Sequence, residues 1–201
     1  MFTGIIEKLG QLETLAETRK DLWEITIGYD GGWNDLEIGE SIAVNGACLT
    51  LTSFDAQSLS MQLSPETMLK TLFGAIQPNA GLNLERAMKL GGRLGGHLLQ
   101  GHVEGFAEVL AVNDQKDCRE ITFGFSREHR PYMIEKGSVG LNGVSLTICD
   151  LANDSFKVAL IPATLSATNL KSLSCGDKVH LETDMIAKYI ESITKQSPQN
   201  N

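Results

Sequence analysis

The sequence lacks several features, and each absence excludes a class of protein. Its four cysteines, Cys48, Cys118, Cys149 and Cys175, include no CxxC pair, which excludes zinc-ribbon and thioredoxin-like redox motifs. No apolar run approaches the length of a membrane span. The first residues hold no basic segment followed by a long apolar stretch, so we expect no signal peptide. Together these absences favour a protein of the reducing cytoplasm with free thiols.

Positive charge is also scarce. The chain has 17 Lys and Arg against 25 Asp and Glu, which gives a formal net charge of −8. A nucleic-acid-binding surface needs clustered Lys and Arg, so the acidic balance argues against one. It also argues, more weakly, against binding to an anionic membrane.

Two motifs that can indicate a ligand lack the required context. The glycine cluster at residues 91–97 (GGRLGGH) contains no Gly-Lys-Ser/Thr, so it does not match a phosphate-binding loop. We expect it to let the chain turn between two halves. His97 and His102 are five residues apart, unlike the i, i+4 pair of a helical metal site, and we predict no metal site there.

What the sequence does contain is an internal repeat with a constant spacing of 97 residues. Residues 41–50 read SIAVNGACLT, and residues 138–147 read SVGLNGVSLT. The same offset pairs Gly4 with Gly101, and no gap is needed between the copies. Each unit of roughly 95 residues lies in the lower range of domain sizes. We therefore expect two halves of one fold with two similar sites, which differ in function where the copies differ in sequence.

Period-two alternation recurs in short runs and predicts strands with one buried face. Gly-rich and Asn/Asp-rich breaks separate the runs, and an Asn-Gly dipeptide between apolar runs favours a tight hairpin. Each half therefore reads as an all-β barrel or sandwich with a short helix. The predicted strands include 23–27, 59–63, 121–125 and 156–160, the hairpin turns lie at 45–46 and 142–143, and the short helices cover 65–73 and 162–170.

The end of the chain changes character. Ile186, Tyr189, Ile190 and Ile193 fall at i, i+3, i+4 and i+7, which predicts an amphipathic helix that Asp184 can cap. The apolar stripe can pack on its own barrel, or it can pack against copies of itself in an oligomer. We expect residues 197–201 to form a frayed tail.

Some positions carry different chemistry in the two copies. His102 stands where the first copy has Ile5, and an imidazole can move protons near neutral pH. A single histidine is also commonly structural. Cys48 pairs with Ser145, which places a thiol and a hydroxyl at matching positions after the Asn-Gly turn. Two small residues that pack at the start of a strand would fit the same pattern.

Other polar positions are candidates with ordinary alternatives. Asp184 stands opposite Ala87 in the repeat, and Lys136 stands opposite Gly39 and can contact an anionic group. Most lysines are simply solvated, and Asp184 can serve only as a helix cap. The retained polar residues near the turns can satisfy backbone groups; they are Ser41 with Ser138 and Thr50 with Thr147.

Five blocks, taken together, resemble the riboflavin synthase family of the alpha-chain type. They lie in order along essentially the whole chain and keep the register of the repeat. The blocks are residues 1–5 (MFTGI), 45–50 (NGACLT), 95–103 (GGHLLQGHV), 136–147 (KGSVGLNGVSLT) and 187–189 (AKY).

The resemblance implies a fold and an activity. It implies two tandem six-stranded Greek-key barrels at residues 1–97 and 98–184, followed by a trimerisation helix and tail at residues 185–201. Members of the family dismutate two molecules of 6,7-dimethyl-8-ribityllumazine into riboflavin and 5-amino-6-(D-ribitylamino)uracil by four-carbon transfer, without a metal or cofactor. They are homotrimers whose active site lies between the first barrel of one subunit and the second barrel of its neighbour. An association with lumazine synthase is a further expectation.

The resemblance also implies site residues. The residues implied in chemistry are Ser41, Cys48, His102, Ser145, Thr147 and Asp184. The implied first pocket consists of Gly4, Ile5, Ile6, Cys48, Leu49, Thr50, Gln62, Leu63, Ser64 and Thr67. The implied second pocket consists of Gly101, His102, Val103, Lys136, Ser145, Leu146, Thr147, Ile161, Pro162 and Thr164.

Two alternatives stay open at this point. One is a non-catalytic lumazine- or flavin-binding antenna protein of the same fold, although the presence of Cys48, His102, Ser145 and Asp184 favours the enzyme. The other is a duplicated barrel with a purely structural role, which would bind no lumazine.

Overall fold

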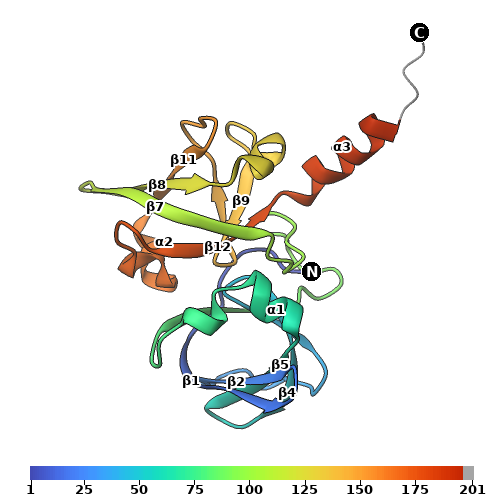
Figure 1. Cartoon of the computed structure of the whole chain (residues 1–201). Coiled ribbons are helices and arrows are strands. Elements are labelled where there is room, and N and C mark those ends of the chain that lie inside the picture. The colour runs from blue at the N-terminus through green and yellow to red at the C-terminus, as the bar shows by residue number, and fades with distance from the viewer. Residues whose placement is uncertain (197–201) are drawn as a thin grey trace.

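The first half of the chain forms a closed six-stranded barrel in a computed structural model that describes residues 1–196 (Figure 1). The predicted tail at 197–201 lies outside the described residues. Neighbouring strands pair antiparallel around the barrel in the order β1-β2-β5-β4-β3-β6. The strands are β1 (Lys8–Arg19), β2 (Leu22–Tyr29), β3 (Ser41–Val44), β4 (Ala47–Phe54), β5 (Ser58–Leu63) and β6 (Gly81–Arg86).

The second half repeats this strand order in a sheet that is open at one seam. Its order is β10-β9-β12-β7-β8-β11, so the seam lies between β10 and β11. The short β10 explains the seam, because it has four residues where β4 has eight. The strands are β7 (Gly105–Asp114), β8 (Arg119–Phe125), β9 (Ser138–Leu141), β10 (Val144–Thr147), β11 (Ser155–Leu160) and β12 (Lys178–Thr183). The prediction of two tandem six-stranded barrels is confirmed.

The short helices end earlier than predicted. Helix α1 (Pro65–Lys70) and helix α2 (Pro162–Ala167) each stop before a threonine with extended backbone, and a 3₁₀ turn follows. The hydroxyls of Thr71 and Thr168 donate to the carbonyls of the residues four positions before them, Thr67 and Thr164. These bonds satisfy the last-turn carbonyls while the chain leaves the helix. The 3₁₀ turns that follow the helices are η1 (Phe73–Ala75) and η3 (Asn169–Ser172), and a further 3₁₀ turn, η2 (Arg127–Tyr132), follows β8.

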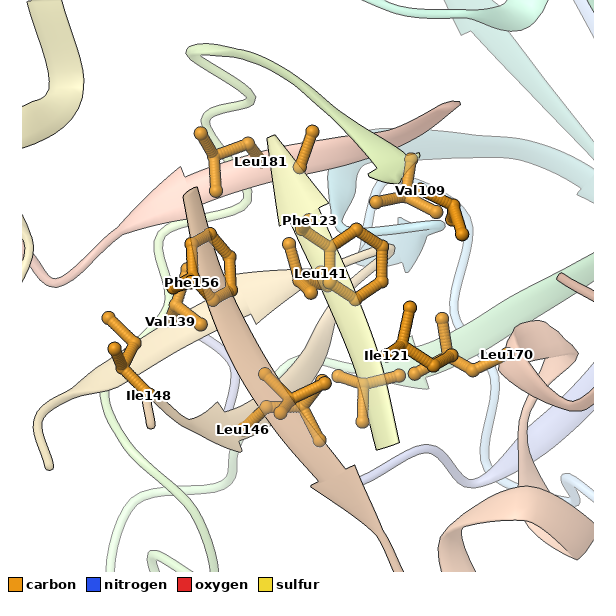
Figure 2. Close-up of a cluster of buried hydrophobic side chains, with 14 of the residues drawn as sticks. Val109, Ile121, Phe123, Val139, Leu141, Leu146, Ile148, Phe156, Leu170 and Leu181 are labelled. Atoms are coloured by element: carbon orange, nitrogen blue, oxygen red, sulfur yellow. The ribbon is translucent and has the colours of Figure 1, made fainter. Parts of the chain in front are cut away.

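The alternation seen in the sequence fills each barrel with aliphatic and aromatic side chains. In the second barrel, Phe123 and Phe156 are fully buried and stack with ring centroids 5.8 Å apart, beside Val139 and Leu141 (Figure 2). Burying one such side chain contributes roughly 1.5–3 kcal/mol, so each half holds a core of its own.

The two Asn-Gly turns fix how closely the barrels approach. Asn45 and Gly46 have φ of 45° and 80°, and Asn142 and Gly143 have φ of 46° and 78°. Both pairs match the left-handed geometry of a type I′ hairpin turn. The turns pack backbone to backbone, because a Cβ on either glycine would lie 2.7 Å from the amide nitrogen of the other. Glycine is therefore required both for the turn and for the contact.

A buried side chain on β6 joins the barrels. The Asn83 side-chain amide donates to the carbonyl of Asn142 at 2.9 Å, and its oxygen accepts from the backbone N–H of Asn169 at 2.8 Å. Asn83 therefore needs one donor and one acceptor, and the second half supplies a partner for each.

His180 on β12 takes the equivalent place in the second copy. Its Nε2 accepts from the N–H of Leu72 at 2.8 Å, so the proton lies on Nδ1, which donates to the carbonyl of Asn45 at 2.8 Å. The imidazole thus reproduces the donor and acceptor of Asn83. Burial lowers the pKa of His180 to about 4, so the ring is neutral at physiological pH.

Helix α3 (Met185–Gln196) leaves the second barrel and extends away from both (Figure 1). Asp184 accepts from the N–H of Ile186 at 2.9 Å, which confirms the predicted N-cap. The predicted stripe does not pack on its own barrel, since its side chains are more than half exposed: Ile186 54%, Tyr189 60%, Ile190 56% and Ile193 66%. None of the helices within residues 1–196 is long and apolar enough to cross a membrane.

Candidate functional site

The segments before β1 and β7 run antiparallel to each other between the two barrels. The N–H of Phe2 donates to the carbonyl of Leu99 at 2.8 Å, and the N–H of Leu99 donates back at 3.1 Å. Each segment then continues toward the barrel of the other half. The carbonyl of Gly4 accepts from the N–H of Ser145 at 2.9 Å. Gly101 makes the equivalent contact with the first barrel: its carbonyl accepts from the N–H of Cys48 at 2.9 Å.

This crossing corrects the predicted composition of the two pockets. The resemblance placed Gly4, Ile5 and Ile6 with the first barrel and Gly101, His102 and Val103 with the second. In the structure, Val103 packs against the core of the first barrel and Ile6 against the core of the second. The prediction was wrong because the repeat aligns the copies but does not show which barrel each segment contacts. We refer below to the cavity that Cys48 lines as the Cys48 pocket, and to the surface at the equivalent position of the second barrel, around Ser145, as the Ser145 pocket.

The Cys48 pocket is a cavity of about 450 Å³ at the end of the first barrel. Ser64 caps helix α1 by accepting from the N–H of Thr67 at 3.1 Å, and their hydroxyls lie 3.0 Å apart. His102 is exposed at the rim of the cavity, and the Cys48 thiol is partly buried in its wall. The complete lining is Ala47, Cys48, Ser64, Glu66, Thr67, Lys70, Thr71, Gly101, His102 and Val103.

Not every predicted residue presents its side chain to a pocket. Leu49, Leu63 and Leu146 are buried in the barrel cores, so only their backbone can contact a ligand. Thr50 and Gln62 are exposed and lie opposite each other on β4 and β5.

Ser41 lies on β3 opposite Thr50, and it is not among the residues that line the cavity. The structure therefore does not bring Ser41 together with Cys48 and His102 in this pocket.

The Ser145 pocket contains a hydroxyl–imidazole pair. The Ser145 Oγ lies 2.7 Å from His97 Nδ1, and His97 is 8% exposed. Burial lowers the pKa of His97, against the opposing effect of the Asp184 carboxylate. Among the described residues, no hydrogen-bond partner reaches His97 Nε2. A neutral imidazole in this position can accept the serine proton and so activate the hydroxyl.

Sequence reasoning missed this role of His97. It placed the residue in the glycine cluster, in the block at residues 95–103 and in a weak metal motif, but it gave His97 no chemical role, and His97 precedes the repeated block that marks Cys48 and Ser145. A partial signal was its position next to the glycine cluster. A Cβ on Gly96 would lie 2.7 Å from Ser145 Oγ, so the glycines there allow the chain to approach the serine.

The remaining residues predicted for the second pocket lie on β10, on α2 and in one loop. Thr147 is exposed on β10, Ile161 is 57% exposed and precedes α2, and Pro162 and Thr164 lie in the first turn of that helix. Ile161 and Thr164 are the counterparts of Ser64 and Thr67, which line the Cys48 pocket.

Lys136 is held in an unusual backbone conformation. Its φ of 64° is left-handed, where the first copy has Gly39 with φ of 94°. A side chain in this region costs about 1 kcal/mol or more relative to glycine. The ammonium Nζ donates to Cys149 Sγ at 3.5 Å, and this contact raises the pKa of Lys136.

Comparison with known proteins gives a consistent result. The model of the family described as "Lumazine binding domain" matches residues 3–87 and again residues 100–184. A riboflavin synthase of Actinobacillus pleuropneumoniae is 38% identical over 98% of this chain and 92% of its own length. A riboflavin synthase of Bacillus subtilis (strain 168) is 36% identical over 100% of this chain and 93% of its own length.

A solved structure shows the same fold. LumP complexed with riboflavin superposes with a TM-score of 0.82, at 23% sequence identity, over 91% of this chain and 99% of LumP. LumP has also been solved with 6,7-dimethyl-8-(1'-D-ribityl)lumazine, and that structure superposes with a TM-score of 0.79 at 22% identity over the same shares of the chains.

Proposed function

The chain belongs to the lumazine binding domain family, and we propose that it is a riboflavin synthase. It converts two molecules of 6,7-dimethyl-8-ribityllumazine into riboflavin and 5-amino-6-(D-ribitylamino)uracil. One observation carries the proposal: the two barrels present unequal reactive groups at equivalent positions, a thiol with His102 in the Cys48 pocket and a hydroxyl with His97 at Ser145. Two copies of one substrate with different roles need two pockets of this kind.

The chemistry requires one acidic and one electrophilic substrate. The 7-methyl group of the lumazine is acidic because its carbanion delocalises into the heterocycle, and a base has to remove its proton. His102 is a candidate for this base, since it is exposed at the pocket rim. The other substrate is activated by addition at C7, for which Cys48 or a water held by it is the candidate, because Ser41 does not line this pocket.

The second pocket contributes proton transfer and orientation. Ser145 with His97 forms an activated hydroxyl, and Thr147 and Asp184 orient the substrate or shuttle protons. Stacking two heterocycles in a closed interface supplies much of the acceleration, since it replaces an encounter in solution with a fixed geometry.

The assembly we propose is a homotrimer whose active site forms between the first barrel of one subunit and the second barrel of its neighbour. The apolar stripe of α3 supports it, because large apolar side chains on one helix face are more than half exposed. A location in the cytoplasm agrees with the free cysteines. Association with lumazine synthase is a separate proposal, tested by co-sedimentation of the two proteins.

The test of the activity is direct. Purified protein mixed with 6,7-dimethyl-8-ribityllumazine is expected to form riboflavin, with one riboflavin for every two lumazines consumed. Chromatography with absorbance detection follows both compounds. Lumazine that binds but is never consumed would contradict the proposal.

The likeness to LumP favours a second candidate, a non-catalytic flavin- or lumazine-binding protein. That protein would bind the ligand and change its fluorescence without any product. The higher identity to riboflavin synthases and the intact Ser145–His97 pair favour the enzyme.

A further inference from the structure

Two buried glutamates occupy equivalent positions in the repeat and make the same contacts. Glu85 on β6 and Glu182 on β12 are 3% and 4% exposed. Glu182 accepts from the N–H groups of Gln100 and Gly101 at 2.6 and 3.0 Å. Glu85 does the same for the other segment, where Thr3 and Gly4 donate at 2.6 and 3.0 Å.

Stabilisation of the fold does not explain why these two carboxylates are buried. Burial raises the pKa of both, and that of Glu182 to about 7, although the backbone donors act in the opposite direction. A buried carboxylate is expensive unless strong hydrogen bonds compensate for its lost hydration. Both copies nevertheless keep it, and each uses its two oxygens to hold the backbone of one crossing segment.

Each clamped segment contacts the opposite barrel, and the segment at Gly101 lines the Cys48 pocket there. Gly101 is held by Glu182 of the second barrel, while its carbonyl accepts from Cys48 of the first barrel at 2.9 Å. Its φ is 79°, and a Cβ there would lie 2.6 Å from the Cβ of Cys48. The next residue is His102, at the rim of the Cys48 pocket.

The other clamp is the mirror case. Gly4 is held by Glu85 of the first barrel, has a φ of 75° and would place a Cβ 2.5 Å from that of Ser145 in the second barrel. Ile5 follows it and is half exposed. The close contacts of Gly101 with Cys48 and of Gly4 with Ser145 leave no space for a shift toward the pocket. The carboxylates of Glu182 and Glu85 hold the two segments in these positions.

We propose that Glu182 and Glu85 are positioning residues, each serving the pocket of the barrel to which it does not belong. Glu182 fixes Gly101 and His102 in the Cys48 pocket, and Glu85 fixes Gly4 and Ile5 in the Ser145 pocket. The proposal rests on the proposed function, because it takes lumazine as the ligand of both pockets. It makes a pocket-selective prediction that a general structural role does not make.

The experiment uses the Cys48 thiol as a reporter of its own pocket. The full-length protein is alkylated with iodoacetamide at increasing concentrations of 6,7-dimethyl-8-ribityllumazine, and mass spectrometry of peptides quantifies modification at Cys48. The variants are Glu182→Gln and Glu85→Gln. Glu13→Gln, an exposed change on β1, is the control.

The amide of Gln replaces one acceptor oxygen with a donor that faces a backbone N–H. We expect the lumazine concentration that half-protects Cys48 to rise about tenfold in Glu182→Gln, the size expected for one lost hydrogen bond to a charged group. Glu85→Gln and Glu13→Gln should keep the wild-type value. Turnover should fall in both Glu182→Gln and Glu85→Gln, because the reaction needs both pockets.

The outcomes separate the two proposals. Equal protection in Glu182→Gln and wild type, or an equal loss in both glutamate variants, would overturn the positioning role. No protection by lumazine in the wild-type protein would overturn the proposed function, and this proposal with it. If Glu182→Gln does not fold, Glu182→Asp gives the same test, because it keeps the charge but shortens the reach to both N–H groups.

Discussion

Cys48 and Ser145 occupy matching positions but have different neighbours, and this difference gives the two pockets unlike chemistry. The serine hydroxyl lies 2.7 Å from a buried imidazole, whereas the thiol lies in a cavity wall below the exposed His102. An oxygen beside a base and a sulfur near the solvent are suited to different steps of one reaction.

The thiol provides the first prediction. Cys48→Ala should lower the rate of riboflavin formation by on the order of 100-fold or more, because a side chain that takes part in the chemistry typically contributes about 10²- to 10⁴-fold. Cys118→Ala is the matched control, because Cys118 lies in the turn between β7 and β8 and its thiol donates to Gln115 in the same turn. Steady-state rates at saturating lumazine measure both, and similar rates for the two variants would count against a role for Cys48.

The crossing glycines provide the second prediction. Gly101 and Gly91 have nearly the same φ, 79° and 78°, but a methyl group added at Gly101 would meet Cys48, whereas one added at Gly91 would meet nothing within 4 Å. Gly91→Ala should therefore cost about 1–2 kcal/mol of stability from backbone strain. Gly101→Ala should cost roughly 1–3 kcal/mol more, because Cys48 has to move. Urea unfolding compares them, and equal losses would show that the contact does not matter.

At the scale of elements, the same pattern of one donated and one accepted hydrogen bond joins the two barrels twice, once through Asn83 and once through His180. Asn83 and His180 each donate to a turn carbonyl and accept from a backbone N–H of the other half. An amide keeps these roles at every pH, whereas an imidazole loses its acceptor when it is protonated. The second copy therefore adds an acid-sensitive contact to the interface.

The third prediction concerns this contact. Because the pKa of His180 is about 4 in the fold and near its ordinary value of about 6.5 when unfolded, the unfolded chain binds the extra proton between these values. Stability is therefore complete above about pH 6.5 and falls as the pH drops toward 4, by up to about 3 kcal/mol. His180→Asn should remove this part of the loss.

The measurement is the free energy of unfolding of both proteins from pH 7.5 to 4.5. His97 and Glu182 titrate in both proteins, Glu182 with the opposite sign because its folded pKa is raised, so the difference between the curves isolates His180. Parallel curves would contradict the assignment of a neutral His180.

The elements were largely predictable from the sequence, and the contacts between the halves were not. Alternation located β2, β5, β8 and β11, and the i, i+3, i+4, i+7 spacing located α3. These elements are predictable because strand alternation and helical spacing involve residues that are close together in the sequence. The pairing of Gly101 with Cys48, and of His97 with Ser145, joins residues 53 and 48 positions apart through the way the two barrels dock. No local pattern encodes that arrangement.

At the scale of the whole molecule, helix α3 carries apolar side chains that a single chain does not bury. Polar contacts hold it to the second half of the chain: Lys188 pairs with Glu104, and the Tyr132 hydroxyl donates to Glu191 at 2.7 Å. Its apolar stripe stays more than half exposed. A helix that is fixed in direction and exposes an apolar stripe is suited to assembly with copies of itself.

The fourth prediction follows from this geometry. Deleting the residues after Met185 should reduce the mass in solution from the proposed trimer to a monomer, and activity should fall together with it, because the active site we propose lies between two chains. Lys195→Gln is the control, since it breaks an exposed pair with Glu191. Light scattering and steady-state rates are measured on the same samples. A monomeric truncated protein with normal turnover would refute the shared site.

The crossing of the first residues has a consequence for how the chain is made. Synthesis delivers residues 2–4 first, but their partners Leu99 and Ser145 leave the ribosome only much later. The first barrel, β1 to β6, can close while residues 2–4 remain exposed to solvent, because N-terminal domains commonly fold first during translation. The lining of the Cys48 pocket is complete only once Gly101, His102 and Val103 have emerged, and Gly4 finds Ser145 later still, so a product that ends before residue 101 has neither arrangement.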